Sequence, residues 1–211
     1  MTELKKLTIF RKYIMKKDQI IFGIIFLVIF VLQAILLTVA GFPIHLLWFS
    51  NHWALLLAIA AFSRSTWLLS AELCIGLIPE IAYMIDFTIE SLTGSSLWGS
   101  TSYMFSPDYS PILYAQGMFH FAILPLAILL FIKWGVHPHA WIAALAHALF
   151  ILTISHAFPQ FNINCSQQAC ASWLSGIQPY YIMYPFVGLI AIMYTQQLLI
   201  WLDSDIISFQ N

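Results

Sequence analysis

Five side chains in apolar surroundings have the chemistry that an active site needs. They are Asn51, His52, Glu80, Asp86 and His120. Imidazole and carboxylate groups are the usual general acids and bases, and an asparagine amide is able to polarise a bound group. Because an ionisable group at the centre of a bilayer costs about 2.5–3.5 kcal/mol on insertion scales, such groups usually face a cavity or a partner. These five residues are therefore the candidate catalytic set.

Three members of this set would also suit a metal ion. The imidazoles of His52 and His120 with the carboxylate of Glu80 would leave one position for water on a zinc ion, which lowers the pKa of that water to about 7. The sequence contains no HExxH motif and no nucleophile elbow. Zinc is therefore a hypothesis that rests on donor types alone, and the reaction type stays open.

The composition defines the setting in which these groups lie. Of 211 residues, 61% are hydrophobic and only 8% are charged, and the mean hydropathy is +0.86. Soluble domains carry about a quarter charged residues, so we expect an all-α polytopic transmembrane helix bundle. Walker, Rossmann and zinc-finger patterns are missing and basic residues are scarce beyond the N-terminus, so we expect no nucleic-acid partner.

Six apolar stretches are predicted to cross the bilayer, whose hydrocarbon core needs about 20 residues of helix. They are residues 20–41, 47–63, 66–87, 114–133, 140–157 and 178–202, between a basic head, 1–19, and a tail, 203–211. The second stretch is the shortest and opens with a polar Ser-Asn-His sequence. A segment that dips into the membrane and returns is the alternative there.

The basic residues predict the orientation of these spans. Six of the eight precede the first span, and the other two are Arg64 and Lys133. The positive-inside rule places the head in the cytoplasm. With six crossings of an inner (cell) membrane, Arg64, Lys133 and the C-terminus are also cytoplasmic. Loops 88–113 and 158–177, which contain no Lys or Arg, then lie outside.

The three cysteines occupy different settings. Cys165 and Cys170 lie in the second outer loop, where an oxidising compartment would allow them to form a disulfide. Proximity in sequence does not establish the required geometry, so free thiols are the alternative. Cys74 lies within the third span and is expected to be a small core residue.

Six crossings would bring the candidate residues to similar depths. At about 1.5 Å of rise per residue, His52 lies roughly 7–8 Å below the outer surface, Glu80 and His120 lie about 10 Å below it, and Asp86 lies at the rim. The sequence therefore predicts one His/carboxylate site in the outer third of the bilayer. The structural alternative is that Asn51 and His52 bond to loop backbone and that His120 is a packed histidine.

Two further ionisable residues have mainly structural interpretations. Glu72 lies on the cytoplasmic half of its span and is expected to pair with Arg64. His147 lies among alanines and is expected to hydrogen-bond across a close contact between helices. Glu72 also continues the polar face of its helix inward, which a path through the membrane would require.

Several short sequences resemble a family of small prokaryotic multi-pass membrane proteins with no assigned activity. They are LWFSNH at 47–52, IDF at 85–87, YMF at 103–105, His120 with Pro125 five residues later, and NIN at 162–164. The resemblance covers roughly residues 43–165. It implies a multi-pass architecture and assigns a role to no residue.

Three functions remain open. The first is an enzyme that processes a lipid or another small amphiphile at the outer leaflet. The second is a small transporter or proton-coupled permease, with Glu72, Glu80 and Asp86 along its path. The third is a structural subunit without catalysis. A haem protein is disfavoured because His120 and His147 differ in depth by roughly 5 Å. The expected partners are the bilayer and, for the enzyme, a lipid or small amphiphilic substrate, and the oligomeric state is open.

Overall fold

The computed structural model describes residues 3–105, 111–167, 169, 176 and 180–210, and these form helices and loops without a strand. The α-helices are α1 (Glu3–Val39), α2 (Phe49–Ser63), α3 (Thr66–Thr93), α4 (Pro111–Gly117), α5 (His120–Trp134), α6 (Ala140–His156) and α7 (Tyr180–Gln210). Short 3-10 helices are η1 (Pro43–Leu47), η2 (Ser102–Phe105), η3 (Pro159–Phe161) and η4 (Ile163–Cys165). The all-α expectation is confirmed for the described residues.

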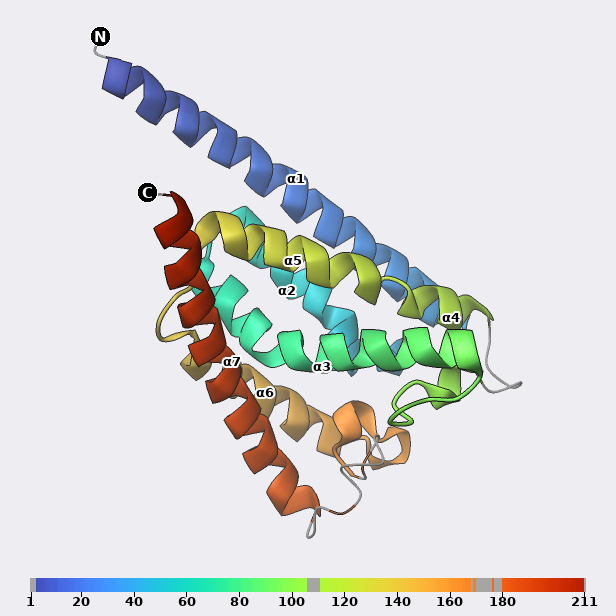
Figure 1. Ribbon diagram of the computed structural model, residues 1–211. Helices are drawn as coiled ribbons and strands as arrows, with labels where there is room; N and C mark the ends of the chain where they lie inside the picture. Colours follow the sequence, from blue (N-terminus) through green and yellow to red (C-terminus); the bar gives the residue numbers. More distant parts are fainter. Residues whose placement is uncertain (1–2, 106–110, 168, 170–175, 177–179, 211) are drawn as a thin grey trace.

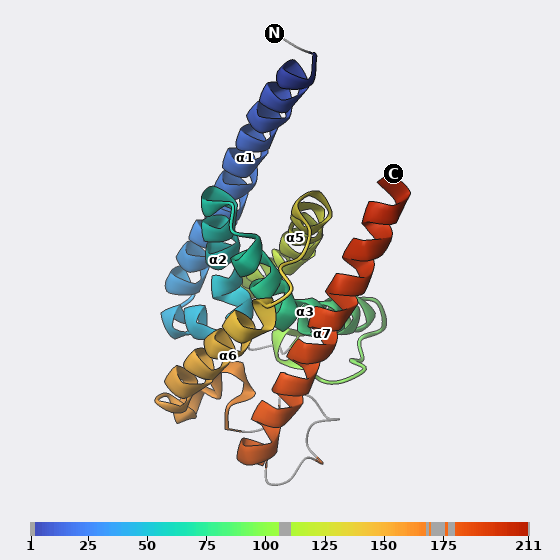
Figure 2. The same ribbon diagram turned by 90° about the vertical axis from the view of Figure 1, so that its left-hand side faces the viewer.

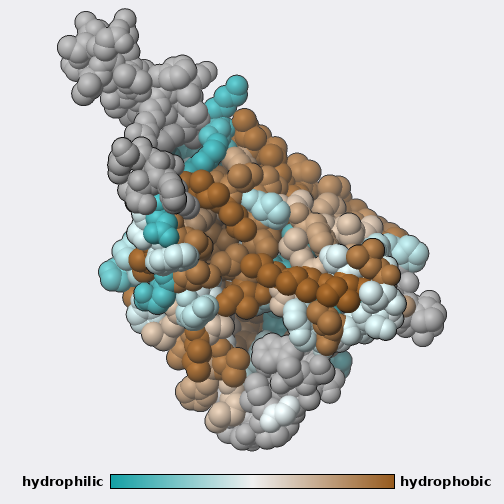
Figure 3. Space-filling view, viewed as in Figure 1, coloured by the Kyte–Doolittle hydropathy of each residue, from teal (hydrophilic) through white to brown (hydrophobic). Residues whose placement is uncertain are grey.

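Four stretches of helix are long and apolar enough to cross a membrane. They are Lys17–Val39, Thr66–Thr93, Tyr114–Trp134 and Met183–Asp205. Helices α2 and α6 are apolar but contain only 15 and 17 residues. These properties are those of a membrane protein with several apolar helices. Large apolar side chains are turned outward, among them Phe150, Ile190 and Tyr194, and apolar residues cover much of the face shown in Figure 3.

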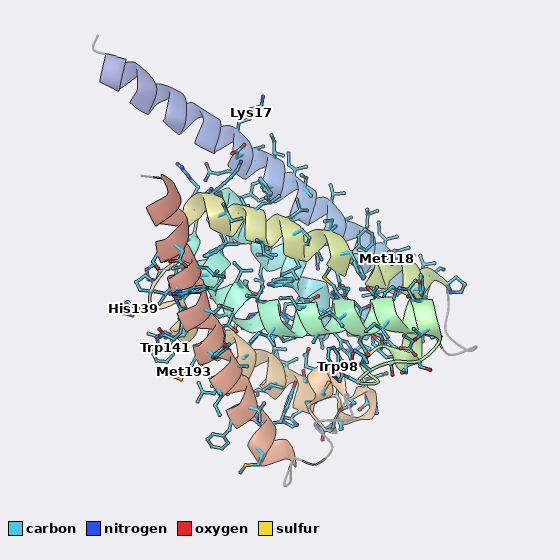
Figure 4. All side chains as sticks on the ribbon, viewed as in Figure 1. Lys17, Trp98, Met118, His139, Trp141 and Met193 are labelled. Carbon is cyan, nitrogen blue, oxygen red and sulfur yellow. The ribbon has the colours of Figure 1, made fainter. Side chains whose placement is uncertain are left out.

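The fourth predicted span differs from a single continuous helix. It is divided into α4 and α5 by a turn at 118–119, where Met118 is labelled in Figure 4. Gly117 lies at this break, and the hydroxyl of Tyr83 lies 2.6 Å from the position that a Cβ on Gly117 would occupy. The close approach of other side chains to a glycine therefore coincides with the bend. His120, as the first residue of α5, lies directly after it.

Both termini lie at one end of the bundle (Figures 1 and 2). At that end Lys133 Nζ lies 2.6 Å from Asp18 Oδ2, and the N–H of Val136 donates to Asp203 over 3.4 Å. The first turns of α1 project beyond the other helices in both views. The basic head is thus a continuation of α1.

At the opposite end, Asn164 joins three segments. Its side-chain oxygen accepts from the N–H of Phe49 at 2.6 Å, and its amide donates to the carbonyl of Leu47 at 2.8 Å and to Ser155 Oγ at 2.9 Å. Its own backbone is left-handed, with φ 53°, a conformation that asparagine adopts more readily than most residues. This side chain fixes the start of α2 against the end of α6.

The turn between α2 and α3 makes these helices antiparallel neighbours. Arg64 ends α2 in the left-handed conformation, with φ 54°, and Ser65 caps α3 by accepting the N–H of Leu68 at 3.1 Å. Trp53 of α2 is fully buried and covers Gly76 of α3. The indole of Trp53 thus packs against the backbone of α3 and is part of the buried core.

Replacing Gly76 with alanine is expected to destabilise the protein by about 1–3 kcal/mol, because the new methyl would lie 2.7 Å from Trp53 Cζ2. Gly188→Ala in α7 is the matched control, since no atom lies within 4 Å of its Cβ position. There alanine is expected to stabilise the helix by up to ~1 kcal/mol. Thermal unfolding in detergent measures both, and shifts of the same sign would contradict the packing described.

Candidate functional site

The shortest contact between candidate residues joins α3 to α5. His120 Nδ1 lies 2.6 Å from Glu80 Oε2, and both side chains are buried. Glu80 follows Pro79, which cannot donate to the carbonyl of Ile75 and so interrupts the backbone bonding of α3 there. The ring of Tyr83, one turn after Glu80, lies 4.5 Å from the imidazole ring. Glu80 and His120 are therefore brought together as the sequence predicts.

This contact gives the pair one defined chemical capacity. A carboxylate on Nδ1 fixes the orientation of an imidazole and stabilises its protonated form. One proton is shared between Glu80 and His120, because two lone pairs at 2.6 Å would repel each other. The pair is thus a proton donor and acceptor inside the bundle.

A double-mutant cycle measures how strongly this pair is coupled. Glu80→Gln and His120→Gln are each expected to lower the free energy of unfolding, because each leaves a buried polar partner poorly satisfied. The double variant is expected to lose less than the sum, by about 1–3 kcal/mol. Additive losses in chemical unfolding would mean that the 2.6 Å contact contributes no coupling.

His52 belongs to a different group of residues from the one predicted. Its Nε2 lies 3.1 Å from Nε2 of His147 on α6, and its Nδ1 lies 3.3 Å from the carbonyl of Leu46. Nδ1 of His147 lies 3.1 Å from Oε1 of Glu72 on α3. Glu72 is 1% exposed. Among the described residues its partner is this histidine, and the expected pairing with Arg64 is not observed.

The donor and acceptor capacities of the ring nitrogens limit where protons lie along this chain. The carbonyl of Leu46 only accepts, so Nδ1 of His52 must donate to it. A neutral His52 then accepts at Nε2, and His147 donates there from its own Nε2. His147 Nδ1 is left facing a carboxylate oxygen. A further proton on either His147 or Glu72 removes the repulsion between them. We call Glu72, His147 and His52 the histidine relay.

His147 is the member of the relay that sequence reasoning assigned only to helix contact. The cross-helix hydrogen bond expected for it is confirmed. Its neighbour Ala144 is fully buried, so α6 is able to approach closely, and the ring then reaches the other two residues. The signal available in the sequence was a histidine placed near mid-membrane on a small-residue face.

Asn51 serves a separate contact between helices. Its amide donates to the carbonyl of His45 at 2.7 Å, and its side-chain oxygen accepts from Gln116 on α4. Asn51 and Gln116 are 6% exposed each. The structural interpretation, bonding to loop backbone, is therefore correct for Asn51, and the bond to Gln116 adds a link between α2 and α4.

Asp86 holds the loop that follows α3. Its two carboxylate oxygens accept hydrogen bonds from the N–H groups of Leu97, Trp98, Ser100 and Thr101 and from the hydroxyls of the last two, at 2.6–3.2 Å. Asp86 is fully buried. The Thr101 hydroxyl also lies 2.9 Å from Oε2 of Glu90, and its one proton serves only one carboxylate. These bonds favour a role for Asp86 in positioning residues 97–101.

The proposed zinc ligands do not meet at one point. Glu80 and His120 are paired, but His52 contacts His147 and Glu72 instead. Within the described part of the chain, no three His, Cys, Asp or Glu side chains are arranged to hold a metal ion. The donor geometry therefore gives the zinc hypothesis no support.

No protein-family model, curated protein or solved structure matches this chain. After α6, Cys165 is disulfide-bonded, whereas Cys170, its predicted partner, lies outside the described residues. Cys74 is free and buried, as expected for a core cysteine.

Proposed function

We propose that the protein is a small proton-coupled permease of the inner (cell) membrane, in which the histidine relay binds and transfers protons between helices. The observation that carries this proposal is the relay itself, three protonatable side chains from α2, α3 and α6 in sequence at 3.1 Å. Chains of histidine and acidic residues within membrane helices are typical of pumps and transporters.

The residues that make up the relay favour transport over catalysis at the outer surface. The enzyme hypothesis needs His52, His120, Glu80 and Asp86 around one site, but these residues divide between the relay, the Glu80–His120 pair and the loop. Glu72 has a role in the transport hypothesis but not in the enzyme hypothesis, and it is a buried member of the relay. The permease explains why a carboxylate remains there.

The proposal includes six crossings with both termini in the cytoplasm. It is supported by the contacts that collect Asp18, Lys133 and Asp203 at one end, and Leu47, Phe49 and Asn164 at the other. Helices α2 and α6 would cross with 15 and 17 residues because the short 3-10 helices before α2 and after α6 would extend each crossing to the outer interface. Loops 88–113 and 158–177 then face outward.

A pH jump on purified protein tests the proposal without knowledge of the transported substrate. Proteoliposomes on a solid-supported membrane are exposed to a sudden drop in pH, and the transient current reports charge moved as protons bind. We expect a current above that of protein-free liposomes. Its absence in folded protein would contradict the permease and favour the structural subunit.

The Glu80–His120 contact supports one second candidate, an enzyme that processes a lipid or small amphiphile. Glu80 would orient His120 as a general base, as the third group of a catalytic triad does. This function predicts that His120→Gln abolishes turnover while His147→Gln, outside the pair, leaves it unchanged. Incubation with labelled membrane lipids, followed by mass spectrometry of products, distinguishes it from the permease.

A further inference from the structure

Among the described residues, seven buried side-chain atoms have no hydrogen-bond partner, and three of these surround the histidine relay. They are Trp53 Nε1, Glu72 Oε2 and His147 Nδ1. Trp53 is 0% exposed and Glu72 is 1% exposed. Nδ1 of His147 approaches Glu72 Oε1 at 3.1 Å without the alignment of a hydrogen bond. The polar atoms of the relay are therefore incompletely satisfied on one side.

Ring contacts place Trp53 of α2 and His147 of α6 on either side of Phe49. The ring of Phe49 lies 5.9 Å from that of Trp53 and 5.6 Å from that of His147. Trp53 Cε2, which is bonded to Nε1, lies 2.8 Å from the Cβ position of Gly76. Gly76 is one helical turn after Glu72 on the same face of α3. Trp53 therefore packs on the face of α3 that carries Glu72, about one turn further along the helix.

The chemistry of these atoms selects their ligand. An indole N–H only donates, whereas the free oxygen of an ionised carboxylate only accepts. Water does both, and buried water in proteins typically binds two to four polar atoms that lack other partners. In a membrane span such atoms are especially costly, because no bulk water reaches them.

We propose that ordered water binds between Trp53 Nε1 and Glu72 Oε2, and that it supplies protons to the relay. The second part rests on the proposed permease function. The water would accept a hydrogen bond from Trp53 and donate one to Glu72. It would transfer its proton to Glu72 as it takes one from the next water, so charge and proton number balance. Trp53 keeps its own proton and is a positioning residue.

NMR of protein labelled with 15N at tryptophan tests the water site directly. The variant Trp53→Phe identifies the indole signal of Trp53 by its loss from the spectrum of protein in lipid nanodiscs. We expect this signal to show magnetisation transfer from a long-lived bound water. Transfer is expected to weaken in Glu72→Gln, whose amide replaces one acceptor oxygen by a donor. A Trp53 indole without any water contact would overturn the proposal.

Proton transfer supplies a separate measurement. In the pH-jump experiment Trp53→Phe is expected to slow the current about tenfold, the lower range for loss of an orienting partner. An unchanged rate would overturn the proton-supply role. Water contact without current in the native protein would leave the water site intact and contradict the permease. Current without water contact would do the reverse.

Discussion

Replacing Glu72 with glutamine is expected to slow proton transfer through the protein about a hundredfold, the lower range of what a positioned acid or base contributes. Glutamine has nearly the same shape and can still contact His147, but it carries no titratable proton. The carboxylate oxygen that faces His147 Nδ1 at 3.1 Å can then no longer take up or release a proton. The rate of the transient current after a pH jump measures this effect.

Glu90→Gln is the matched control for this experiment. Glu90 lies on the same helix and is also buried, at 7% exposed, but it contacts Thr101 of the outer loop rather than the relay. We expect a current close to that of the native protein. Equal slowing in both variants would mean that the loss of any buried carboxylate on α3 slows the current, whether or not it belongs to the relay. An unchanged current in Glu72→Gln would remove the relay from the mechanism.

Replacing Asp86 with alanine is expected to release the loop at 97–101 from α3. Four backbone N–H groups and the Ser100 hydroxyl lose their acceptor in one step, whereas the Thr101 hydroxyl keeps Glu90 as an acceptor. Hydrogen bonds to a charged group contribute about 1.5–3 kcal/mol each, although water will satisfy some of the released donors. We therefore expect a loss of stability of about 3–5 kcal/mol, comparable with breaking a buried ion pair.

Hydrogen–deuterium exchange locates this effect in the chain. The peptide that covers 97–101 is expected to exchange much faster in Asp86→Ala, because its amide protons become accessible by local opening. Asp203→Ala is the control, since Asp203 accepts one long bond of 3.4 Å from Val136. If residues 97–101 exchange in Asp86→Ala at the same rate as in the native protein, contacts other than those to Asp86 hold the loop.

The helical class of the protein follows from composition, because long apolar stretches leave few alternatives to helices. The pairing of Glu80 with His120 also agrees with the prediction from depth, since two helices that start and end at one interface bring residues of equal depth together. Helix ends were less accessible to prediction. The break at 118–119 depends on side chains that meet at Gly117 from elsewhere in the chain.

The relay was harder to predict than the pair. Depth alone cannot say which face of α2 meets which neighbour, so His52 was grouped with His120 rather than with His147. Asp86 is a carboxylate in an apolar stretch, as an active-site residue would be, but its partners include backbone groups of 97–101. Backbone donors carry no signature in the sequence, so a loop anchor and an active-site carboxylate look the same there.

Pro79 lies between two buried carboxylates of α3, those of Glu72 and Glu80. Glu72 lies before the proline and Glu80 directly after it, while Asp86 carries the outer loop on the same later half. A change of the bend at Pro79 would therefore move Glu80, Asp86 and the attached loop together as a rigid body, relative to the part of α3 that carries Glu72. The spacing between the two imidazole–carboxylate groups would then change together with access from outside.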